Sequence, residues 1–279
     1  MQTLKCGRFE IDLSRPRIMA IINVTPDSFS GDGLGHDLDA ALRRCEAAVE
    51  AGARFLDLGG ESTRPGSQPV SEQEELDRVV PLVERLADWP VPVSVDTVKP
   101  AVMRASLAAG ASLINDINGF RAPGAIDALQ GSNAAVCVMH MQGEPRSMQS
   151  SPHYGDVVGE VLDFLTRRVQ ELEALGIDKS RITIDPGFGF GKTLEHNLAM
   201  FRALDHFVAT GRPVLIGVSR KSMLGAIIGR PVAERTPASV AAALMAVERG
   251  ARIVRVHDVA ATRDALSVWE AVENVTVSN

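Results

Sequence analysis

Polar residues recur at the ends of short apolar segments along this 279-residue chain, and together they could bind a small charged molecule. In chain order they are Asn23, Asp57 with Glu61, Asp96, Asn115 with Asp116, His140, Asp185, Ser219 to Lys221, and Arg255 with His257. Any single Asp or Asn of this set is more simply explained as a helix cap or a loop residue. Because the pattern recurs after almost every apolar segment, we interpret these residues as the lining of one site.

The spacing of Arg255 and His257 predicts an anion-binding corner. Side chains two residues apart in a strand point to the same side, so these two would present their nitrogens together. Both residue types bind phosphate through charge-assisted hydrogen bonds, and α/β barrels often hold phosphate after their last two strands. The alternative is that Arg255 only neutralises a nearby carboxylate.

Asp96 and Asp185 are predicted to point into one cavity together with polar neighbours. Each ends an apolar segment in which a hydroxyl residue two positions earlier shares its face, Ser94 in the first and Thr183 in the second. Buried carboxylates need a partner. We therefore expect an NH-rich or cationic ligand, or a lysine such as Lys221, to meet them.

Asn115 and the segment DPGFGFGKT indicate a flat heterocycle as the ligand. The Asn115 amide can donate and accept at once, which suits the edge of such a ring. The glycines of the segment would let the backbone pass close to the ligand while Phe188 or Phe190 covers a ring face. The alternative for this segment is a tight turn between a strand and a helix. The whole pattern favours a ligand with an NH-rich ring at one end and phosphate at the other.

Several common catalytic motifs are absent or incomplete. The DPGFGFGKT segment has Pro186 where a Walker phosphate loop needs glycine, and it does not match the GxGxxG dinucleotide fingerprint. The chain contains neither a GxSxG elbow nor an HExxH helix. Serine hydrolases and zinc proteases are therefore poor candidates.

Two glycine-rich polar segments, Val24 to Asp37 and Gly60 to Val70, have the composition of lid loops above a site. The alternative is that they are ordinary solvated connections. As lids they would contribute Asp27, Phe29, Asp32, Thr63 and Arg64.

The elements that must position these residues alternate regularly. Short apolar runs typical of buried strands are Ile18 to Asn23, Phe55 to Gly59, Pro92 to Asp96, Leu113 to Ile117, Ala134 to Met139, Ile182 to Asp185, Val214 to Val218 and Ile253 to His257. Helical spacing is clearest at Leu38 to Ala51, Glu72 to Ala87, Val157 to Leu175, Ala238 to Glu248 and Thr262 to Val275. Glycines that could end helices precede several strands: Gly52, Gly110, Gly176 and Gly250.

This alternation predicts an α/β fold, a closed (β/α)8 TIM barrel over about residues 18–275, with an open doubly wound sheet as the alternative. Carboxyl ends of parallel strands meet at one face of such a barrel, so the polar residues above would converge there. The residues before Ile18 are expected to form a short hairpin that caps the opposite face. We find no linker in the sequence and expect one domain over residues 1–279.

Composition supports a globular cytoplasmic protein. The chain is 45% hydrophobic and 23% charged, and its net charge of -6 argues against a surface for nucleic acid or for anionic membranes. Cys6, Cys45 and Cys137 form no CxxC pair, so we interpret them as reduced packing residues. The start lacks a signal core, and the most apolar run, Ala238 to Val247, is too short to span a membrane.

Eight strings resemble the dihydropteroate synthase family of the bacterial folate pathway. They are INVTPDSFS, GGESTRPG, SVDT, INDI, MHMQG, DPGFGFGK, SRKS and RVHD. They occur in this order at successive predicted strand ends, from about Ile18 to Val259, and so cover essentially the whole barrel. One such string would be a weak signal, whereas eight in order are highly specific.

The resemblance implies a (β/α)8 barrel transferase of alkyl or aryl groups other than methyl. The implied reaction condenses p-aminobenzoate with 6-hydroxymethyl-7,8-dihydropterin diphosphate and requires Mg2+. Diphosphate would leave first and the amine would then attack, which gives 7,8-dihydropteroate. The first loop reads SFSGDGLG where the family reads SFSDGG, so Asp32 has no assigned role.

The resemblance also implies a role for each matching residue. The pterin would be held by Asp96, Asn115, Met139, Asp185, Phe190 and Lys221. The diphosphate would be held by Asn23, Arg64, Arg255 and His257, with Asn23 as a ligand of the diphosphate-bound Mg2+. The p-aminobenzoate pocket would be shaped by Phe29, Thr63, Arg64, Pro65, Arg220 and Ser222. The catalytic residues would be Asp96, Lys221, Arg255 and His257.

Departure of diphosphate leaves positive charge on the pterin, while negative charge grows on the leaving group. Such a reaction needs opposite electrostatic fields at two ends of one cavity and no covalent nucleophile. This requirement agrees with the distribution of acids and bases along the chain and with the missing catalytic triad.

Two alternatives share parts of this pocket. A pterin-binding methyltransferase that uses methyltetrahydrofolate would need no diphosphate site, so SRKS and the pair of Arg255 and His257 favour the synthase. A noncatalytic pterin-binding homologue could lack the two loops, which this chain retains. A homodimer is implied by the resemblance alone; the run from Ala238 to Val247 is a candidate interface, with ordinary helix burial as its alternative.

Overall fold

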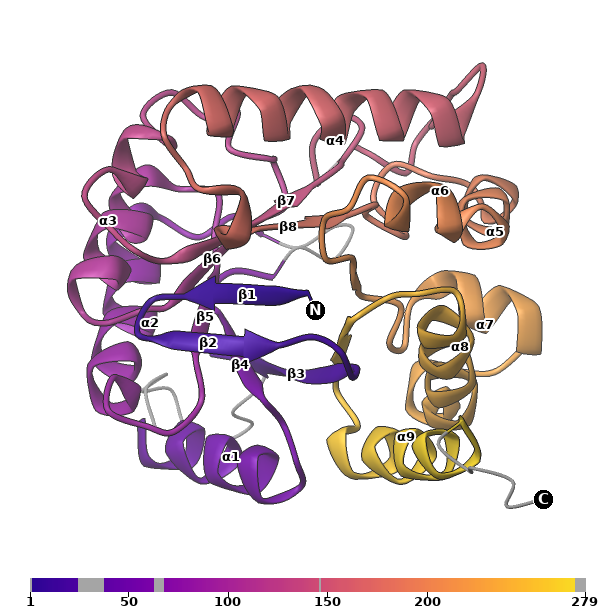
Figure 1. Ribbon diagram of the computed structural model, residues 1–279, viewed down its shortest axis with the longest axis horizontal. Coiled ribbons are helices and arrows are strands. Elements are labelled where there is room, and N and C mark those ends of the chain that lie inside the picture. Colours follow the sequence, from indigo (N-terminus) through magenta and orange to yellow (C-terminus); the bar gives the residue numbers. More distant parts are fainter. Residues whose placement is uncertain (1, 25–37, 63–67, 146, 274–279) are drawn as a thin grey trace.

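Eight parallel strands form one sheet in the order β8-β7-β6-β5-β4-β3-β10-β9 (Figure 1). The computed structural model describes residues 2–24, 38–62, 68–145 and 147–273. The strand bounds are β3 (Arg17–Asn23), β4 (Phe55–Gly59), β5 (Val93–Asp96), β6 (Leu113–Asp116), β7 (Ala135–Met139), β8 (Ile182–Asp185), β9 (Leu215–Ile216) and β10 (Ile253–Val256). A parallel bridge between Ile184 and Val214 joins the two edge strands and closes the ring. The predicted barrel is therefore confirmed over the open sheet.

Helices surround the strands on the outside of the barrel (Figure 1). Their bounds are α1 (Leu38–Glu50), α2 (Glu72–Leu86), α3 (Pro100–Ala108), α4 (Val157–Ala174), α5 (Leu194–Arg202), α6 (Leu204–Val208), α7 (Ser222–Ile228), α8 (Thr236–Glu248) and α9 (Val259–Glu273). The described ranges also contain the short 3-10 turns η2 (Asp127–Leu129), η3 (Lys179–Arg181) and η4 (Val232–Glu234). The four glycines predicted to end helices, Gly52, Gly110, Gly176 and Gly250, all have φ between +90° and +111°.

The predicted elements differ from the structure mainly at their ends. The run from Val214 to Val218 narrows to the two residues of β9, because this strand pairs with β10 over only two positions and meets β8 through one bridge. The last helix begins at Val259 rather than Thr262. The sequence did not predict this first turn, because it carries no periodic apolar signal. The turn is formed because the Thr262 amide and hydroxyl both donate to the Asp258 carbonyl.

Alternate side chains of the strands enter two separate cores. Outward-facing residues such as Ile18, Leu56 and Val136 pack with the helices in the larger core. Inward-facing residues at the amino ends, among them Met19, Phe55 and Leu113, form a smaller core inside the barrel. The remaining inward positions, toward the carboxyl ends, are largely polar and form the site described below.

An antiparallel hairpin of β1 (Thr3–Cys6) and β2 (Phe9–Asp12) lies across the amino-end face of the barrel (Figure 1). Leu4, Cys6 and Leu13 are fully buried against the inner core. The Gly7 amide donates to the Asn133 carbonyl at 3.0 Å, which fixes the turn to the barrel. The predicted capping hairpin is confirmed, and it closes the face opposite the site.

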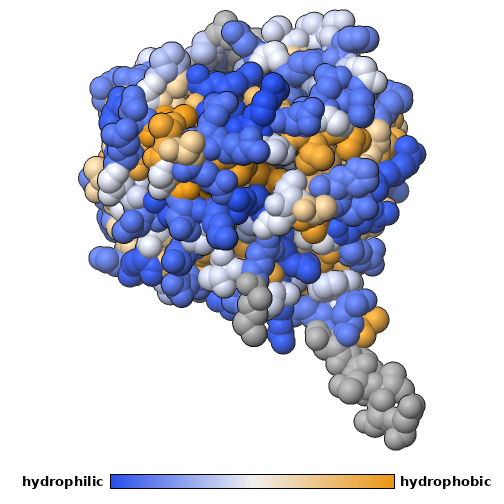
Figure 2. Space-filling view, turned by 45° about the horizontal axis from the view of Figure 1, so that its top comes forward, coloured by the Kyte–Doolittle hydropathy of each residue, from blue (hydrophilic) through white to orange (hydrophobic). Residues whose placement is uncertain are grey.

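The three cysteines are packing residues, as predicted. Cys6, Cys45 and Cys137 are buried and free. Figure 2 shows a face on which hydrophilic residues predominate, with apolar residues between them. No helix in the described ranges has both the length and the apolar character needed to cross a membrane.

Candidate functional site

Side chains from five strands converge at the carboxyl ends of the barrel. Arg255 on β10 donates from Nε to Asp57 Oδ2 on β4 at 2.5 Å and from Nη2 to Asp96 Oδ2 on β5 at 2.8 Å. Asn115 on β6 donates to Asp57 Oδ2 at 3.4 Å. Asp185 on β8 lies beside this group, since a Cβ on Gly217 would be 3.9 Å from Arg255 and 4.0 Å from Asp185 Oδ2. The structure thus brings together four sequence-predicted residues, Asp96, Asn115, Asp185 and Arg255.

Asp57 is the buried centre of this group and is fully excluded from solvent. Its carboxylate accepts hydrogen bonds from the Ser94 hydroxyl at 2.5 Å, from Asn115 and from Arg255. These donors offset the desolvation of the buried charge. They also fix which way the Asn115 amide and the Arg255 guanidinium face.

Asp96 and Arg255 have opposite pKa shifts. Burial raises the pKa of Asp96 to about 7, with Arg255 opposing this shift and Asp57 adding to it. Burial alone would lower the pKa of Arg255, but Asp57 and Asp96 outweigh it and raise that pKa. Arg255 is therefore a permanent cation, while Asp96 can exchange a proton near neutral pH. Arg255 thus pairs with two carboxylates, and its predicted role at an anion stays a prediction.

Two acceptor oxygens remain for a ligand. The Asn115 Oδ1 atom is buried and has no hydrogen-bond partner among the described residues. The Asp185 carboxylate accepts from the Gly187 amide through Oδ1 at 2.7 Å, and burial raises its pKa while Lys221 opposes that shift. A buried acceptor without a donor is costly. A ligand with N–H groups at its edge would satisfy both side chains.

An apolar wall made of methionines and one aromatic ring borders these acceptors. Buried Ile117, Met139, Met141 and Met148 form a cluster against which Phe190 packs. The Lys221 ammonium lies 4.4 Å from the Phe190 ring centroid and donates to the Phe188 carbonyl. Phe188 itself is fully buried and packs edge-on against Phe201 in the outer core, so only Phe190 is placed to cover a ligand ring.

Lys221 is close enough to Asp185 to affect its charge but forms no ion pair with it among the described residues. Burial lowers the pKa of Lys221 to about 8, with Asp185 opposing the shift. The sequence predicted a lysine such as Lys221 as partner of both buried acids. In the structure Asp96 pairs with Arg255 instead, and Lys221 acts on Asp185 only through its charge at longer range.

Residues predicted to shape the amine pocket begin helix α7. Arg220 has a φ of +57°, its amide donates to the Ser239 hydroxyl, and its guanidinium pairs with Asp258 at 2.5 and 3.0 Å. Ser222 is exposed at the first position of α7. Phe29, Thr63, Arg64 and Pro65, together with Asp27 and Asp32, lie outside the described residues.

His257 and Asn23 lie at neighbouring strand ends. The His257 Nδ1 atom is 3.0 Å from the Ser219 hydroxyl, which also accepts from the His257 amide at 3.2 Å. Asn23 ends β3, and a Cβ on Gly59 of β4 would lie 3.7 Å from its Oδ1 atom. Among the described residues no cluster of three or more His, Cys, Asp or Glu could hold a metal ion. The Asn23 amide oxygen is of the oxygen-ligand type that Mg2+ accepts, and its role as a metal ligand stays a prediction.

A cavity of about 330 Å³ opens beside Asp96. On its wall the Lys99 ammonium contacts Glu61 Oε2 and Glu75 Oε2, each at 2.5 Å. Glu61 Oε1 accepts from the Val70 amide at 3.3 Å. These contacts tie together residues on both sides of the second predicted loop, so Glu61 and Lys99 hold its two ends in place.

Sequence reasoning did not predict the central position of one buried group, Asp57, or the burial of another, Lys192. Asp57 was one of the polar strand ends, but no feature of the sequence distinguished it from a capping residue. Lys192 was considered only as part of an incomplete phosphate loop, yet it is 3% exposed and bonds to three residues of the surrounding loops. Its position after a glycine-rich segment was the one available signal. Asp116, also a strand end, instead accepts from the amides of Asn118 and Phe120, as expected of a loop residue.

The comparisons with known proteins agree with this geometry. The family model described as "Pterin binding enzyme" matches residues 19–257. A relative named dihydropteroate synthase, from Haemophilus influenzae, is 50% identical over 268 residues, which covers 95% of this chain and 96% of that protein.

Solved structures of similar proteins include complexes with small molecules. A dihydropteroate synthase from Burkholderia cenocepacia, in complex with 7,8-dihydropteroate, is 58% identical, with a TM-score of 0.89 and coverage of 97% of this chain and 96% of its own. One from Xanthomonas albilineans, with 4-aminobenzoic acid, is 49% identical, with a TM-score of 0.92 and coverage of 98% and 99%.

Proposed function

The chain belongs to the dihydropteroate synthase family of pterin-binding transferases, and from this premise we propose how its barrel mouth performs the reaction. Its substrates are 6-hydroxymethyl-7,8-dihydropterin diphosphate and p-aminobenzoate, and its products are 7,8-dihydropteroate and diphosphate. The observation that carries this proposal is the buried Asn115 Oδ1 acceptor, which has no partner among the described residues, next to the buried Asp185 carboxylate and the pair of Asp96 and Arg255.

The pterin lies against the acidic wall. Its ring N–H and amino groups donate to Asn115 and Asp185, and Asp96 contributes a further acceptor. Met139 and Phe190 cover its faces, and Lys221 lies over the Phe190 ring where it can donate to ring acceptors.

Bond cleavage separates charge across this cavity. As the exocyclic methylene loses diphosphate, positive charge spreads over the pterin and is stabilised by the carboxylates of Asp96 and Asp185. Negative charge develops on the leaving group and is stabilised by Arg255, His257 and Arg64. The p-aminobenzoate amine then attacks the methylene carbon and loses a proton. Preorganised charges of this kind account for most of the rate enhancement in such sites, and no covalent nucleophile is needed.

The diphosphate end also suits Mg2+. This ion keeps several waters and is usually bound by few protein ligands together with substrate phosphates. Asn23 would supply its one side-chain oxygen from this chain, and the ion when bound neutralises the growing charge on the leaving group.

The amine substrate approaches from the side of α7. Arg220 and Ser222 border this side, and the family resemblance adds Phe29, Thr63, Arg64 and Pro65 as further residues for the amine substrate. The Arg220 guanidinium already donates from Nε and Nη2 to Asp258. Two of its donors are therefore occupied before the carboxylate of p-aminobenzoate arrives.

We also propose that the protein acts as a cytoplasmic homodimer. Six large apolar side chains that are at least 36% exposed lie on α7, η4, α8 and α9, namely Ile227, Ile228, Val232, Met245, Val268 and Val272. These helices are neighbours (Figure 1). Exposed apolar side chains on neighbouring helices favour contact with a second copy of the chain.

A coupled assay of diphosphate release tests the proposed reaction. We expect release only when the pterin diphosphate, p-aminobenzoate and Mg2+ are all present. Methyl transfer from methyltetrahydrofolate to a corrinoid protein would instead support the methyltransferase. Pterin binding without turnover of either kind would support a noncatalytic homologue.

A further inference from the structure

Lys192 is an almost completely buried lysine outside the proposed contact set. Its ammonium contacts three residues: His140, through Nδ1 at 3.0 Å and the carbonyl at 3.5 Å, the Gly187 carbonyl at 2.9 Å and the Phe190 carbonyl at 3.0 Å. It forms no ion pair within the part of the chain that the structure describes. Burial lowers its pKa to about 7, with Asp185 opposing the shift. A buried lysine without a carboxylate partner is energetically costly, which indicates a role that an apolar residue could not fill.

These contacts join two segments at the barrel mouth. His140 follows β7, whereas Gly187 and Phe190 belong to the loop after β8. These segments lie directly on each other: a Cβ at Gly187 would be 1.9 Å from the His140 carbonyl oxygen, and one at Gly191 would be 2.4 Å from that of Gln142. The buried Lys192 ammonium bonds to both segments and so links them.

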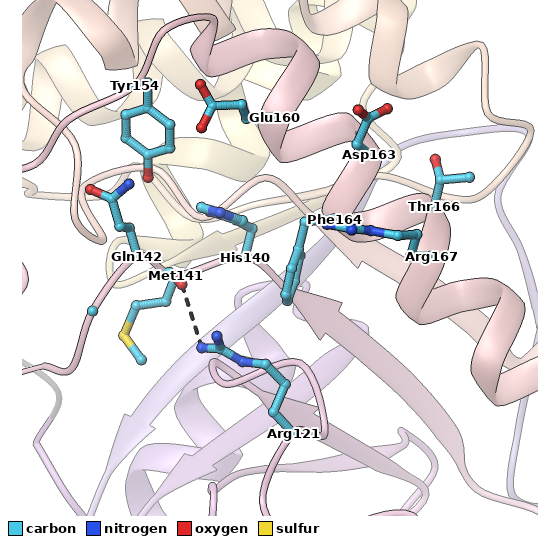
Figure 3. A pocket seen from close by; sticks show the side chains of 11 residues that line it. Arg121, His140, Met141, Gln142, Tyr154, Glu160, Asp163, Phe164, Thr166 and Arg167 are labelled. Carbon is cyan, nitrogen blue, oxygen red and sulfur yellow. Dashed lines mark hydrogen bonds between the residues drawn. The ribbon is translucent and has the colours of Figure 1, made fainter.

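The His140 ring is packed between aromatic side chains. Figure 3 shows its ring between Tyr154 and Phe164, at the edge of a cavity of about 550 Å³ on the outer side of the β7 loop. Phe164 contacts the ring edge-on at a centroid distance of 4.9 Å, and the Tyr154 hydroxyl donates to the Gly191 carbonyl at 2.9 Å. Lys192 therefore connects the β8 loop to a histidine that is packed between two aromatic rings.

Each segment carries one apolar face of the pterin cavity. Met139 directly precedes His140, and Phe190 is two residues before Lys192. Both belong to the methionine cluster beside Asn115 and Asp185. The separation of these two faces is thus set by the segments that Lys192 joins.

We propose that Lys192 is a positioning residue for pterin binding, which fixes the distance between Met139 and Phe190 by tying the β8 loop to His140. This inference rests on the proposed function, because it takes a pterin as the bound ring. It does not place Lys192 in contact with any substrate.

Calorimetric titration with 6-hydroxymethylpterin tests the proposal on the full chain. Lys192→Met keeps the length of the side chain and removes its donors, and we expect pterin affinity to fall at least tenfold. The matched control is Lys179→Met, an exposed lysine of η3 ahead of the same strand, which should bind as the wild type does. Equal affinity in Lys192→Met and wild type would overturn the proposal. Should Lys192→Met not fold, Lys192→Gln is the second variant: its side chain is shorter and uncharged and cannot reach all three partner residues, so full wild-type affinity in that variant would also contradict the proposal.

A double-mutant cycle separates positioning from loss of stability. If Lys192 acts through Phe190, the effect of Lys192→Met on affinity should nearly vanish in a Phe190→Ala background. Effects that multiply would overturn positioning through Phe190. A wild-type protein that binds no pterin would instead refute the proposed function, so the two failures are distinguishable.

Discussion

Asp96 and Lys221 set the pH range in which the proposed chemistry works. The working state needs an ionised Asp96 beside the developing cation and a protonated Lys221 over Phe190. With pKa values near 7 and 8, respectively, kcat/KM should rise as pH increases through about 7 and fall as it increases beyond about 8. The measurement is the pH profile of kcat/KM for the pterin diphosphate.

Asp96→Asn checks the acidic limb of that profile. We expect this variant to lose the limb and to turn over on the order of 10²-fold more slowly, since one preorganised charge is removed. If kcat/KM of Asp96→Asn still rises through about pH 7 as in wild type, another group is responsible for that rise.

Individual site residues were predictable only where their position in a strand determines to which side their side chain points. Asp96, Asn115, Asp185 and Arg255 follow from strand ends and a period of two, because parallel strands present alternate side chains to one cavity. The pairing of Arg255 with Asp57 was not predictable, since it depends on the register between strands that are distant in the sequence. Lys192 was not predictable either, because its partners are mainly carbonyls, which every residue has.

At the level of single elements, the β8 loop depends on glycine at position 187. Gly187 has a φ of +72°, and a Cβ there would collide with the His140 carbonyl. Gly131 has a nearly equal φ of +76° but nothing within 4 Å of such a Cβ, so it is a matched control. Gly131→Ala should cost about 1–2 kcal/mol in unfolding free energy, and Gly187→Ala should cost clearly more and also weaken pterin binding. Chemical denaturation of both variants measures the difference, and equal costs would refute the steric argument.

The amino-terminal hairpin should contribute to stability and not to catalysis. Leu4 is fully buried at the floor of the barrel, opposite the site. Leu4→Ala should therefore lower the unfolding free energy by about 2–5 kcal/mol and leave kcat/KM unchanged below the unfolding transition. Thr3→Ala, an exposed change on the same strand, is the control. A large loss of kcat/KM in folded Leu4→Ala would mean that the two ends of the barrel are coupled.

Most elements were predictable because buried parallel strands and amphipathic helices have distinct apolar periods. The prediction was weakest at β9, where a seemingly continuous apolar run provides only two paired residues. The reason is that strand length here depends on partners across the barrel closure, which the local sequence does not encode.

At the level of the whole molecule, the exposed apolar surface on α7, α8 and α9 should mediate dimerisation. Met245, which is 44% exposed, lies on α8 within this surface, whereas Leu175, which is 63% exposed, lies at the end of α4. Met245→Glu should place a charge in the interface and raise the dimer dissociation constant at least 100-fold, while Leu175→Glu should not change it. Sedimentation velocity measures both, and a Met245→Glu variant that remains as dimeric as wild type would exclude this surface.

The central claim is that carboxylates inside the carboxyl-end mouth of the barrel bind an NH-rich ring. Calorimetric titration of a pterin into wild type, Asp185→Asn and Asp178→Asn tests it most directly, because Asp185 ends β8 at the site, whereas Asp178 caps the turn η3 that precedes β8. A hydrogen bond to a charged group contributes about 1.5–3 kcal/mol. Asp185→Asn should therefore bind the pterin about 10- to 100-fold more weakly, and Asp178→Asn should bind it as wild type does. Undiminished pterin affinity in a folded Asp185→Asn protein would contradict the account.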